Sequence, residues 1–324
     1  MSDSCKIISL GEVCDYLRKH DNYLILTHAS PDGDTLGSGF GLMRVLEDLG
    51  KKAKVFCPEG IPKKFEYLAK TPKVDFKEKT IVAVDIADPK LLGMACEQYA
   101  DKVQLCIDHH ISNTKYSKSL YLDATSAAAC ESIYTIAVAL GVEINKDIAN
   151  ALYTGIATDT GCFKFSNTTA KTHSITAKLF EAGVDATEIN RAMFETISCA
   201  RLDIERLALD TIDFRFNGKC AVISITADMI EKTKCEKSDL EGITAIARTI
   251  EGVVVGITLR ENQRGRIKAS VRTHDPIDAC AICNNLGGGG HPRASGCEVV
   301  GDVDHAKQEI LKYVGQALEN ANLI

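Results

Sequence analysis

Short apolar runs alternate with longer helical patterns from the start of the chain to about residue 190. The runs are rich in Val, Ile and Leu, and this alternation is typical of a parallel sheet whose two faces are covered by helices. We therefore expect an α/β fold. Strands are expected over 23–28, 54–57, 80–85 and 103–108. Helices are expected over 36–49, 62–69, 89–99, 126–140 and 146–158, the first and fourth ended by Gly50 and Gly141.

Polar side chains follow three of these strands where each apolar run stops. In open parallel sheets the carboxyl ends of neighbouring strands line one crevice, so residues distant in sequence can converge there. A further acid, after a strongly helical run, could join them. The candidates are His28, Asp32 and Asp34 after the first strand, Asp85 after the third, Asp108, His109 and His110 at the end of the fourth, and Asp159.

Such a set of acids and imidazoles suits a pair of divalent metal ions. Two ions about 4 Å apart need several carboxylates to offset four positive charges, with one carboxylate bridging both. Imidazole ligands favour manganese over magnesium, and such a pair activates water for attack on phosphorus. Taken singly, each acid has a simpler interpretation. Asp32 and Asp34 would shape the Pro-Asp-Gly turn, and Asp159 would cap a helix.

The length of 324 residues favours two domains. We expect a parallel-sheet domain over 1–195, a connecting helix within 196–216, and a smaller α/β domain over 217–324. The connecting helix rests on an amphipathic pattern from Ala200 to Phe214. In the second domain, strands are expected over 220–225, 253–259 and 267–271, the last two joined as a hairpin, with a final helix over 303–318.

Composition narrows the classes of function. A net charge of -6 and a pI near 5.8 argue against a protein that grips long nucleic acid with its whole surface. The sequence contains no apolar stretch long enough to span a membrane, and Met1–Cys5 lacks a basic region, so we expect a cytoplasmic protein. The 13 cysteines favour buried thiols over disulfides. Cys280 and Cys283 have the spacing of a CxxC motif, for which a metal or redox role is the alternative.

The motifs, taken in order, resemble those of the DHH phosphoesterases, a family named for the Asp-His-His seen here at 108–110. The first motif continues into Gly37-Ser38, and the last acid precedes Thr160-Gly161. The resemblance implies two metal sites that share Asp85 as a bridge. It also implies that His110 faces the scissile phosphate and that Asp108 orients the histidines. The implied ligands are His28, Asp32 and Asp85 for one metal, and Asp34, Asp85, His109 and Asp159 for the other.

The second half resembles the glycine-rich domain that accompanies one branch of this family. The match runs through 268–272 and through 287–291, continuing to 294–296. Glycine amides approach an anion closely, and arginine or histidine adds charge-assisted contacts to phosphate. The alternatives are a mobile loop for the glycines and solvated hairpin positions for the arginines. The substrate clamp that the resemblance implies consists of Arg260, Ser270, Arg272, Gly288, Gly289, Gly290 and His291.

Within the family the chain looks most like the bacterial and archaeal nano-RNases. That resemblance implies hydrolysis of very short oligoribonucleotides to mononucleotides, of 3′-phosphoadenosine-5′-phosphate (pAp) to AMP, or of both, and it allows a homodimer. Hydrolysis of cyclic dinucleotides or their linear products remains open. An inorganic pyrophosphatase would lack the glycine-rich motif, and an exonuclease for long DNA would need a further nucleic-acid-binding region. A regulatory module that binds nucleotides without turnover is the non-enzyme alternative.

Overall fold

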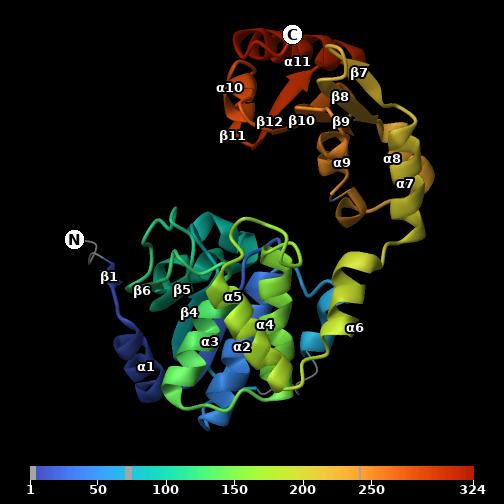
Figure 1. The fold of residues 1–324 in the computed structure, drawn as a ribbon. Helices are drawn as coiled ribbons and strands as arrows, with labels where there is room; N and C mark the ends of the chain where they lie inside the picture. The colour runs from blue at the N-terminus through green and yellow to red at the C-terminus, as the bar shows by residue number, and fades with distance from the viewer. Residues whose placement is uncertain (1–4, 70–74, 241) are drawn as a thin grey trace. The chain divides into compact units, whose positions relative to one another are not determined.

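The computed structural model describes residues 5–69, 75–240 and 242–324 (Figure 1). The chain divides into two compact units, 1–196 and 197–324. Of the N-terminal segment considered above, residues 1–4 lie outside the described residues. In the described part of the chain, no helix combines the length and apolar character needed to cross a membrane.

The first unit is built on a parallel six-stranded sheet with the order β1-β6-β5-β4-β2-β3. All side chains of the three central strands are buried, which explains why these strands read as continuous apolar runs. The α/β fold predicted for this part of the chain is confirmed. The strands are β1 (Lys6–Ile7), β2 (Tyr23–Leu26), β3 (Ala53–Phe56), β4 (Thr80–Val84), β5 (Leu105–Asp108) and β6 (Ser119–Leu122).

Helices cover one face of this sheet, with α2 and α3 in contact with its strands and α4 packed against both of these helices. Gly141 caps α3 in the left-handed conformation, as expected, and Gly50 has a positive φ just beyond α2. The α-helices are α1 (Leu10–Lys19), α2 (Gly33–Asp48), α3 (Ala129–Leu140), α4 (Lys146–Asp159), α5 (Ala170–Glu181) and α6 (Ala186–Asn190), and the last is followed by a π-helical turn, η4 (Arg191–Glu195).

Two predicted α-helices prove to be 3-10 segments. One is η1 (Lys63–Ala69), and the region expected as a helix over 89–99 splits into η2 (Pro89–Leu92) and η3 (Met94–Lys102). The split falls at Gly93, which has a φ of 70° and ends η2. Apolar side chains of η2 and η3 pack on the sheet face opposite α2. Short 3-10 turns therefore cover that face where a full helix was expected.

The second unit contains a mixed six-stranded sheet with the order β11-β12-β10-β9-β8-β7. Only β8 and β9 are parallel neighbours, and the other pairs are antiparallel. The expected hairpin is present, with its strands extended at both ends of the turn. The strands are β7 (Asp213–Arg215), β8 (Cys220–Ile225), β9 (Val255–Gln263), β10 (Arg266–Thr273), β11 (Gly289–His291) and β12 (Ala294–Val300).

Helices cover both faces of this second sheet. One apolar core lies between the sheet and α10 (Ala279–Asn284) with α11 (Val303–Asn320), and a second lies under α7 (Cys199–Leu209) and α9 (Ile243–Thr249). Between α7 and α9 come α8 (Ala227–Thr233) and a 3-10 turn, η5 (Lys237–Leu240). The amphipathic stretch expected as a helix up to 214 is shorter than predicted, because its last residues form β7.

Candidate metal centre

The candidate ligands of the first unit come from three neighbouring strands and two helices. The carboxyl ends of β2, β4 and β5 are adjacent in the sheet, and they carry His28, Asp85 and His109. Asp34 lies in the first turn of α2, and Asp159 is the last residue of α4. The sequence-predicted residues therefore meet at one edge of the sheet, as the strand-end argument requires.

Glycines allow α2 and α4 to pack closely enough to bring their two acids together. A Cβ at Gly37 would overlap the Ala151 carbonyl oxygen of α4, and one at Gly33 would overlap Thr158. On the facing helix, a Cβ at Gly155 would lie 2.6 Å from Asp34 Oδ1. The sequence singled out Gly37 as part of a motif, and the structure gives its packing reason.

Asp85 lies between two sets of donor atoms. Its Oδ2 is 3.9 Å from His28 Nε2, which is itself 3.6 Å from Asp32 Oδ1. Its Oδ1 is 3.5 Å from His109 Nε2, which lies 3.6 Å from both Asp34 Oδ2 and Asp159 Oδ2. Each oxygen of one buried carboxylate thus faces a different set of imidazole and carboxylate groups.

Asp34 is held by the start of another helix. Its Oδ2 accepts a hydrogen bond from the Ala129 amide at 2.6 Å, and its Oδ1 accepts one from the Cys130 amide at 3.0 Å. These amides open α3, whose N-cap residue, Ala128, makes no side-chain cap. The positive end of α3 therefore favours the ionised carboxylate of Asp34.

Asp32 and Asp159 differ in how far local structure explains them. Asp32 caps α2, because its Oδ1 accepts from the amides of Asp34 and Thr35, as the turn interpretation expects, and it also belongs to a group of side chains that could hold a metal ion. Asp159 lies instead at the C-terminal end of α4, where the helix dipole disfavours a negative charge. A capping role cannot account for Asp159.

The electrostatics of this cluster point to bound cations. Burial, followed by the nearby carboxylates, raises the pKa of Asp85 well above its usual range, and burial also raises the pKa of Asp34. Burial and the charge of Asp34 raise the pKa of Asp159 to about 7. Asp85 Oδ1 and His109 Nε2 are buried without a hydrogen-bond partner. Oxygen and nitrogen donors left unpaired next to mutually repelling acids fit divalent metal ions.

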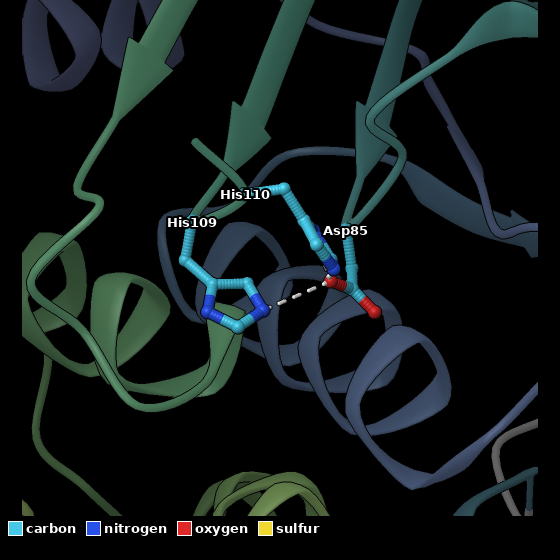
Figure 2. A group of neighbouring side chains, drawn as sticks. All are labelled: Asp85, His109 and His110. Carbon is cyan, nitrogen blue, oxygen red and sulfur yellow. Dashed lines mark ion pairs between the residues drawn. The ribbon is translucent and has the colours of Figure 1, made fainter. Parts of the chain in front are cut away.

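Figure 2 shows the two histidines of the DHH motif beside Asp85. Their hydrogen-bond partners differ. His109 Nδ1 lies 3.1 Å from the Ser126 carbonyl oxygen, which leaves Nε2 facing Asp85. His110 Nδ1 lies 2.8 Å from Asp108 Oδ1, and this hydrogen bond raises the pKa of His110. His110 Nδ1 is also 3.5 Å from Asp85 Oδ1, and Asp85, His109 and His110 form a further group that could hold a metal ion, but the hydrogen bond to Asp108 occupies this Nδ1.

Asp108 does not face the group of candidate metal ligands. It is fully buried, and its Oδ1 accepts from the amides of His109 and His110 in addition to the His110 ring. Its Oδ2 accepts from the Asn113 side chain at 2.6 Å. Although burial opposes ionisation, these hydrogen bonds lower the pKa of Asp108. This fixed carboxylate thus contacts the ring of His110 and the backbone amides of His109 and His110.

A hollow of about 340 Å³ opens beside the cluster. Lys90 and Ser30 on its wall were not singled out from the sequence, because neither belongs to a motif nor ends a strand. The Ser126 carbonyl was missed for the same reason. The hollow is lined by His28, Ala29, Ser30, Asp32, Asp85, Lys90, Leu91, His110 and Asp159.

In the second unit a basic pocket of about 280 Å³ lies on the sheet face carrying the predicted clamp. It includes Arg260, Ser270 and Arg272. Thr258 on the same wall has a buried hydroxyl without a partner. In a strand every second residue points to the same face, so Lys268 could have been identified from Ser270 and Arg272 of β10. The sequence gives no such signal for the lining residues from η5 and α9. The residues that the prediction missed are Lys237, Leu240, Gly242, Thr244, Thr258 and Lys268, with Ile225 at the edge.

His291 shares that sheet face but does not line the pocket. It pairs with Ala294, which pairs with Arg272 on the next strand. Paired residues of antiparallel strands point to the same face, so His291 and Arg272 lie two strands, or roughly 10 Å, apart on one surface.

The second half of the predicted glycine run lies in a strand. Gly289 to His291 form β11, and a Cβ at Gly290 would lie 2.7 Å from the Ala294 carbonyl oxygen. The Gly288 amide donates to the Cys283 carbonyl oxygen at 2.9 Å. That amide is not free for an anion, so close packing explains Gly288.

The structure also shows the state of the cysteines and the contacts of Arg293. Every cysteine is a free thiol, and no metal-ligating group within the described ranges includes Cys280 or Cys283. Arg293, which stands next to the glycine motif, forms an ion pair with Asp275 and donates to the Ile277 carbonyl oxygen. Arg293 therefore supports the loop around it.

Comparison with known families matches both units. Residues 22–156 match the N-terminal domain of the DHH family, and residues 217–320 match the DHHA1 domain. Curated relatives match over nearly the whole chain. A protein of Thermus thermophilus named bifunctional oligoribonuclease and PAP phosphatase NrnA is 35% identical over 93% of this chain and 91% of its own length. A Bacillus subtilis protein of the same name is 25% identical over 86% of this chain and 90% of its own.

Solved structures share the architecture. An exopolyphosphatase-related protein from Bacteroides fragilis superimposes with a TM-score of 0.83 at 26% identity, covering 96% of this chain and 95% of its own. RecJ from Thermus thermophilus in complex with Mn²⁺ superimposes with a TM-score of 0.53 at 15% identity, covering 95% of this chain and 54% of its own. This second likeness concerns the fold alone.

Proposed function

The chain belongs to the DHH family, and from that membership we propose that it is a metal-dependent phosphoesterase that hydrolyses very short oligoribonucleotides to mononucleotides, pAp to AMP, or both. The observation that carries the proposal is the position of Asp85. Its two oxygens face two different sets of donor atoms, the arrangement that a bridging carboxylate between two metal ions requires.

The donor set supports two divalent ions. One would be held by His28, Asp32 and Asp85, whose donor atoms lie within 4.8 Å of one another. The other would be held by Asp34, His109 and Asp159, which form a second such group, together with Asp85, whose Oδ1 is 3.5 Å from His109 Nε2. The mixture of imidazole and carboxylate favours Mn²⁺. Bound there, two such ions would supply charge neutralisation at the phosphate oxygens and would lower the pKa of a water molecule that attacks phosphorus.

His110 and Asp108 would act on the leaving group. Asp108 holds His110 Nδ1 and raises the pKa of the ring, which favours the imidazolium. The exposed part of His110 lines the hollow beside the metal cluster. An imidazolium there stabilises the oxygen that departs from phosphorus and can donate a proton to it.

The basic pocket of the second unit supports nucleotide substrates. Arg260, Arg272, Lys237 and Lys268 place four cationic side chains around one pocket, and none of the described residues that line it is an acid. Arginine binds phosphate oxygens with two parallel hydrogen bonds, so a terminal phosphate group is the natural occupant. His291, on the same face, would extend this clamp. The names of the Thermus and Bacillus relatives point to the same substrates.

A substrate panel tests the proposal. The full chain with Mn²⁺ is incubated with RNA of two, about five and about twenty-five nucleotides, with pAp, with cyclic dinucleotides and with pyrophosphate. We expect release of mononucleotides from the dinucleotide and of AMP from pAp, and little attack on the long strand. Asp85→Asn, purified in parallel, excludes a contaminating nuclease. Turnover of pyrophosphate alone, or nucleotide binding without turnover, would replace the proposal by the pyrophosphatase or the regulatory-module alternative.

A further inference from the structure

Lys90 extends from a short segment that is fixed beside the metal cluster. The Lys90 amide donates to Asp88 Oδ1 at 2.9 Å, and the Leu91 carbonyl oxygen accepts from the Ala29 amide at 2.8 Å. Gly93 ends the segment, and a Cβ there would lie 2.6 Å from Ala29 Cβ. These contacts tie η2 to the loop that follows β2, so the backbone of Lys90 is held at the wall of the hollow.

The ammonium group of Lys90 is uncommitted. It forms no hydrogen bond or ion pair with any residue that the structure describes, although Asp32, Asp85 and Asp159 line the same hollow. The side chain is exposed at the rim. The hollow therefore combines several acids with a lysine that none of them neutralises.

A charge count indicates what this lysine faces when metal is bound. The four carboxylates of Asp32, Asp34, Asp85 and Asp159 carry four negative charges, which balance two divalent ions with neutral imidazoles. A phosphodiester then brings a negative charge that the ligands leave unbalanced. A free ammonium on the wall would offset that charge, whereas it would repel the metal ions themselves.

We propose that the Lys90 ammonium binds a non-bridging oxygen of the phosphate group that is attacked, and that it does not help to hold metal. The proposal rests on the proposed function for the identity of the substrate. It makes Lys90 a substrate-contacting residue in addition to the motif residues. It also has an unusual consequence: removing the charge weakens phosphate binding while metal binding stays the same or tightens.

The test measures these two affinities separately in the full chain. Titration calorimetry gives the affinity of the metal-free protein for Mn²⁺, and the affinity of the Mn²⁺-loaded protein for inorganic phosphate. For Lys90→Gln we expect phosphate affinity about tenfold lower, the size of a charge-assisted hydrogen bond at a partly solvated site, and unchanged or tighter Mn²⁺ binding. Lys90→Arg should retain most of the phosphate affinity.

Lys79→Gln is the matched control. This lysine is also exposed, but it precedes β4, whereas Lys90 follows the other end of the same strand, where the hollow lies. Unchanged phosphate affinity in Lys90→Gln would overturn the proposal. A parallel loss of phosphate and Mn²⁺ affinity would do so as well, since it would indicate a structural role. If the wild type hydrolyses none of the panel, the proposed function fails, while phosphate binding still decides the role of Lys90.

Discussion

Asp85 joins the two donor sets through an unusual backbone. It follows the last residue of β4 with a φ of 58°, a left-handed conformation that few residues other than Gly, Asn and Asp adopt readily. Its amide donates to the Ile107 carbonyl oxygen at 3.0 Å, which fixes the turn. The carboxylate is thereby directed toward both donor sets at a cost in backbone strain and in charge repulsion.

Asp85→Asn is therefore a sharper test than an alanine substitution, because Asn tolerates the same backbone and keeps the same shape. We expect kcat to fall at least about a hundredfold, since several kcal/mol of charge stabilisation depend on the bridging carboxylate. We also expect the metal-free variant to unfold at a higher temperature than the wild type, because the repulsion among the acids is relieved. Activity with Mn²⁺ and thermal unfolding without metal measure the two effects. Retention of full activity would contradict the two-metal assignment.

The acid cluster also predicts how the metal-free protein responds to pH. The pKa values of Asp85 and Asp34 are raised by burial, and that of Asp159 is raised to about 7, whereas an unfolded Asp titrates near about 3.9. Between these values the folded state binds more protons than the unfolded state, so stability falls as pH rises. The raised pKa of His110 acts in the same direction.

We therefore expect the metal-free protein to have a lower unfolding temperature at about pH 8 than at about pH 5.5, and Mn²⁺ to stabilise it more at the higher pH. Calorimetry at the two pH values, with and without Mn²⁺, measures both. Asp85→Asn serves as the control and should show a smaller pH effect. A metal-free protein that becomes more stable over this interval would show that the acids do not repel one another as the structure implies.

At the scale of single residues, the sequence reveals the acids and imidazoles because they interrupt apolar strands. Asp85 is recognisable since four apolar residues precede it. Lys90 and Ser126 lack such a signal. Lys90 matters through an uncommitted ammonium, and Ser126 through a backbone carbonyl, and neither property is encoded in a residue type or a spacing.

Helix packing sets the separation of the acids on α2 and α4. Gly33, Gly37 and Gly41 recur every four residues along α2, and a Cβ at each would overlap or crowd α4. Residues four apart share one face of a helix, so these glycines form a flat surface against α4. That close packing brings Asp34 near Asp159, which links a packing feature to the metal site.

Gly37→Ala tests this link. An added methyl group would collide with the Ala151 carbonyl oxygen, and we expect a loss of about 1–3 kcal/mol of stability together with weaker Mn²⁺ binding. Gly11→Ala is the matched control, since a Cβ at this helical glycine meets no atom within 4 Å. That control should be neutral or stabilising by up to about 1 kcal/mol. Normal Mn²⁺ affinity in Gly37→Ala would show that the packing of α2 against α4 does not control metal binding.

Several elements that carry apolar periodicity could be predicted, although α1 and α5, whose buried residues also recur at helical spacing, were missed. The central strands and helices α2, α3 and α4 match their patterns within a few residues. The segment over 89–99 has a helical pattern but forms 3-10 turns, because Gly93 breaks it. Strands β1 and β6 were missed, since a two-residue strand and a four-residue strand that is fully buried only at its two middle residues give weak signals.

The whole molecule divides its proposed chemistry between two units. The first unit contains the acids and imidazoles that suit metal ions, and the second contains a pocket with four cationic side chains. The sequence indicated this division through its change of pattern near residue 190. It could not reveal the pocket, because Lys237 and Thr244 reach it from η5 and α9 and share no motif with β10.

This division predicts that substrate binding and metal binding can be lost independently. In Arg272→Ala the pocket loses a half-buried guanidinium, and we expect KM for a 5′-phosphorylated dinucleotide to rise about tenfold or more, with unchanged Mn²⁺ affinity. His291→Ala should have a smaller effect of the same kind, because His291 lies outside the pocket. Steady-state kinetics and Mn²⁺ titration of the same preparations measure the two properties.

Arg264→Ala is the control for Arg272→Ala. Arg264 belongs to the turn between β9 and β10, its side chain is 84% exposed, and it lies 3.6 Å from Asp228. Its loss should leave KM unchanged, because it does not line the pocket. If Arg272→Ala lowered Mn²⁺ affinity as much as substrate affinity, the pocket would not be a separate substrate site. If neither the Mn²⁺ affinity nor the substrate affinity changed, the cationic side chains of the second unit would bind something other than the substrate. The preference for short nucleotides would then have to arise within the first unit, which carries the candidate metal ligands.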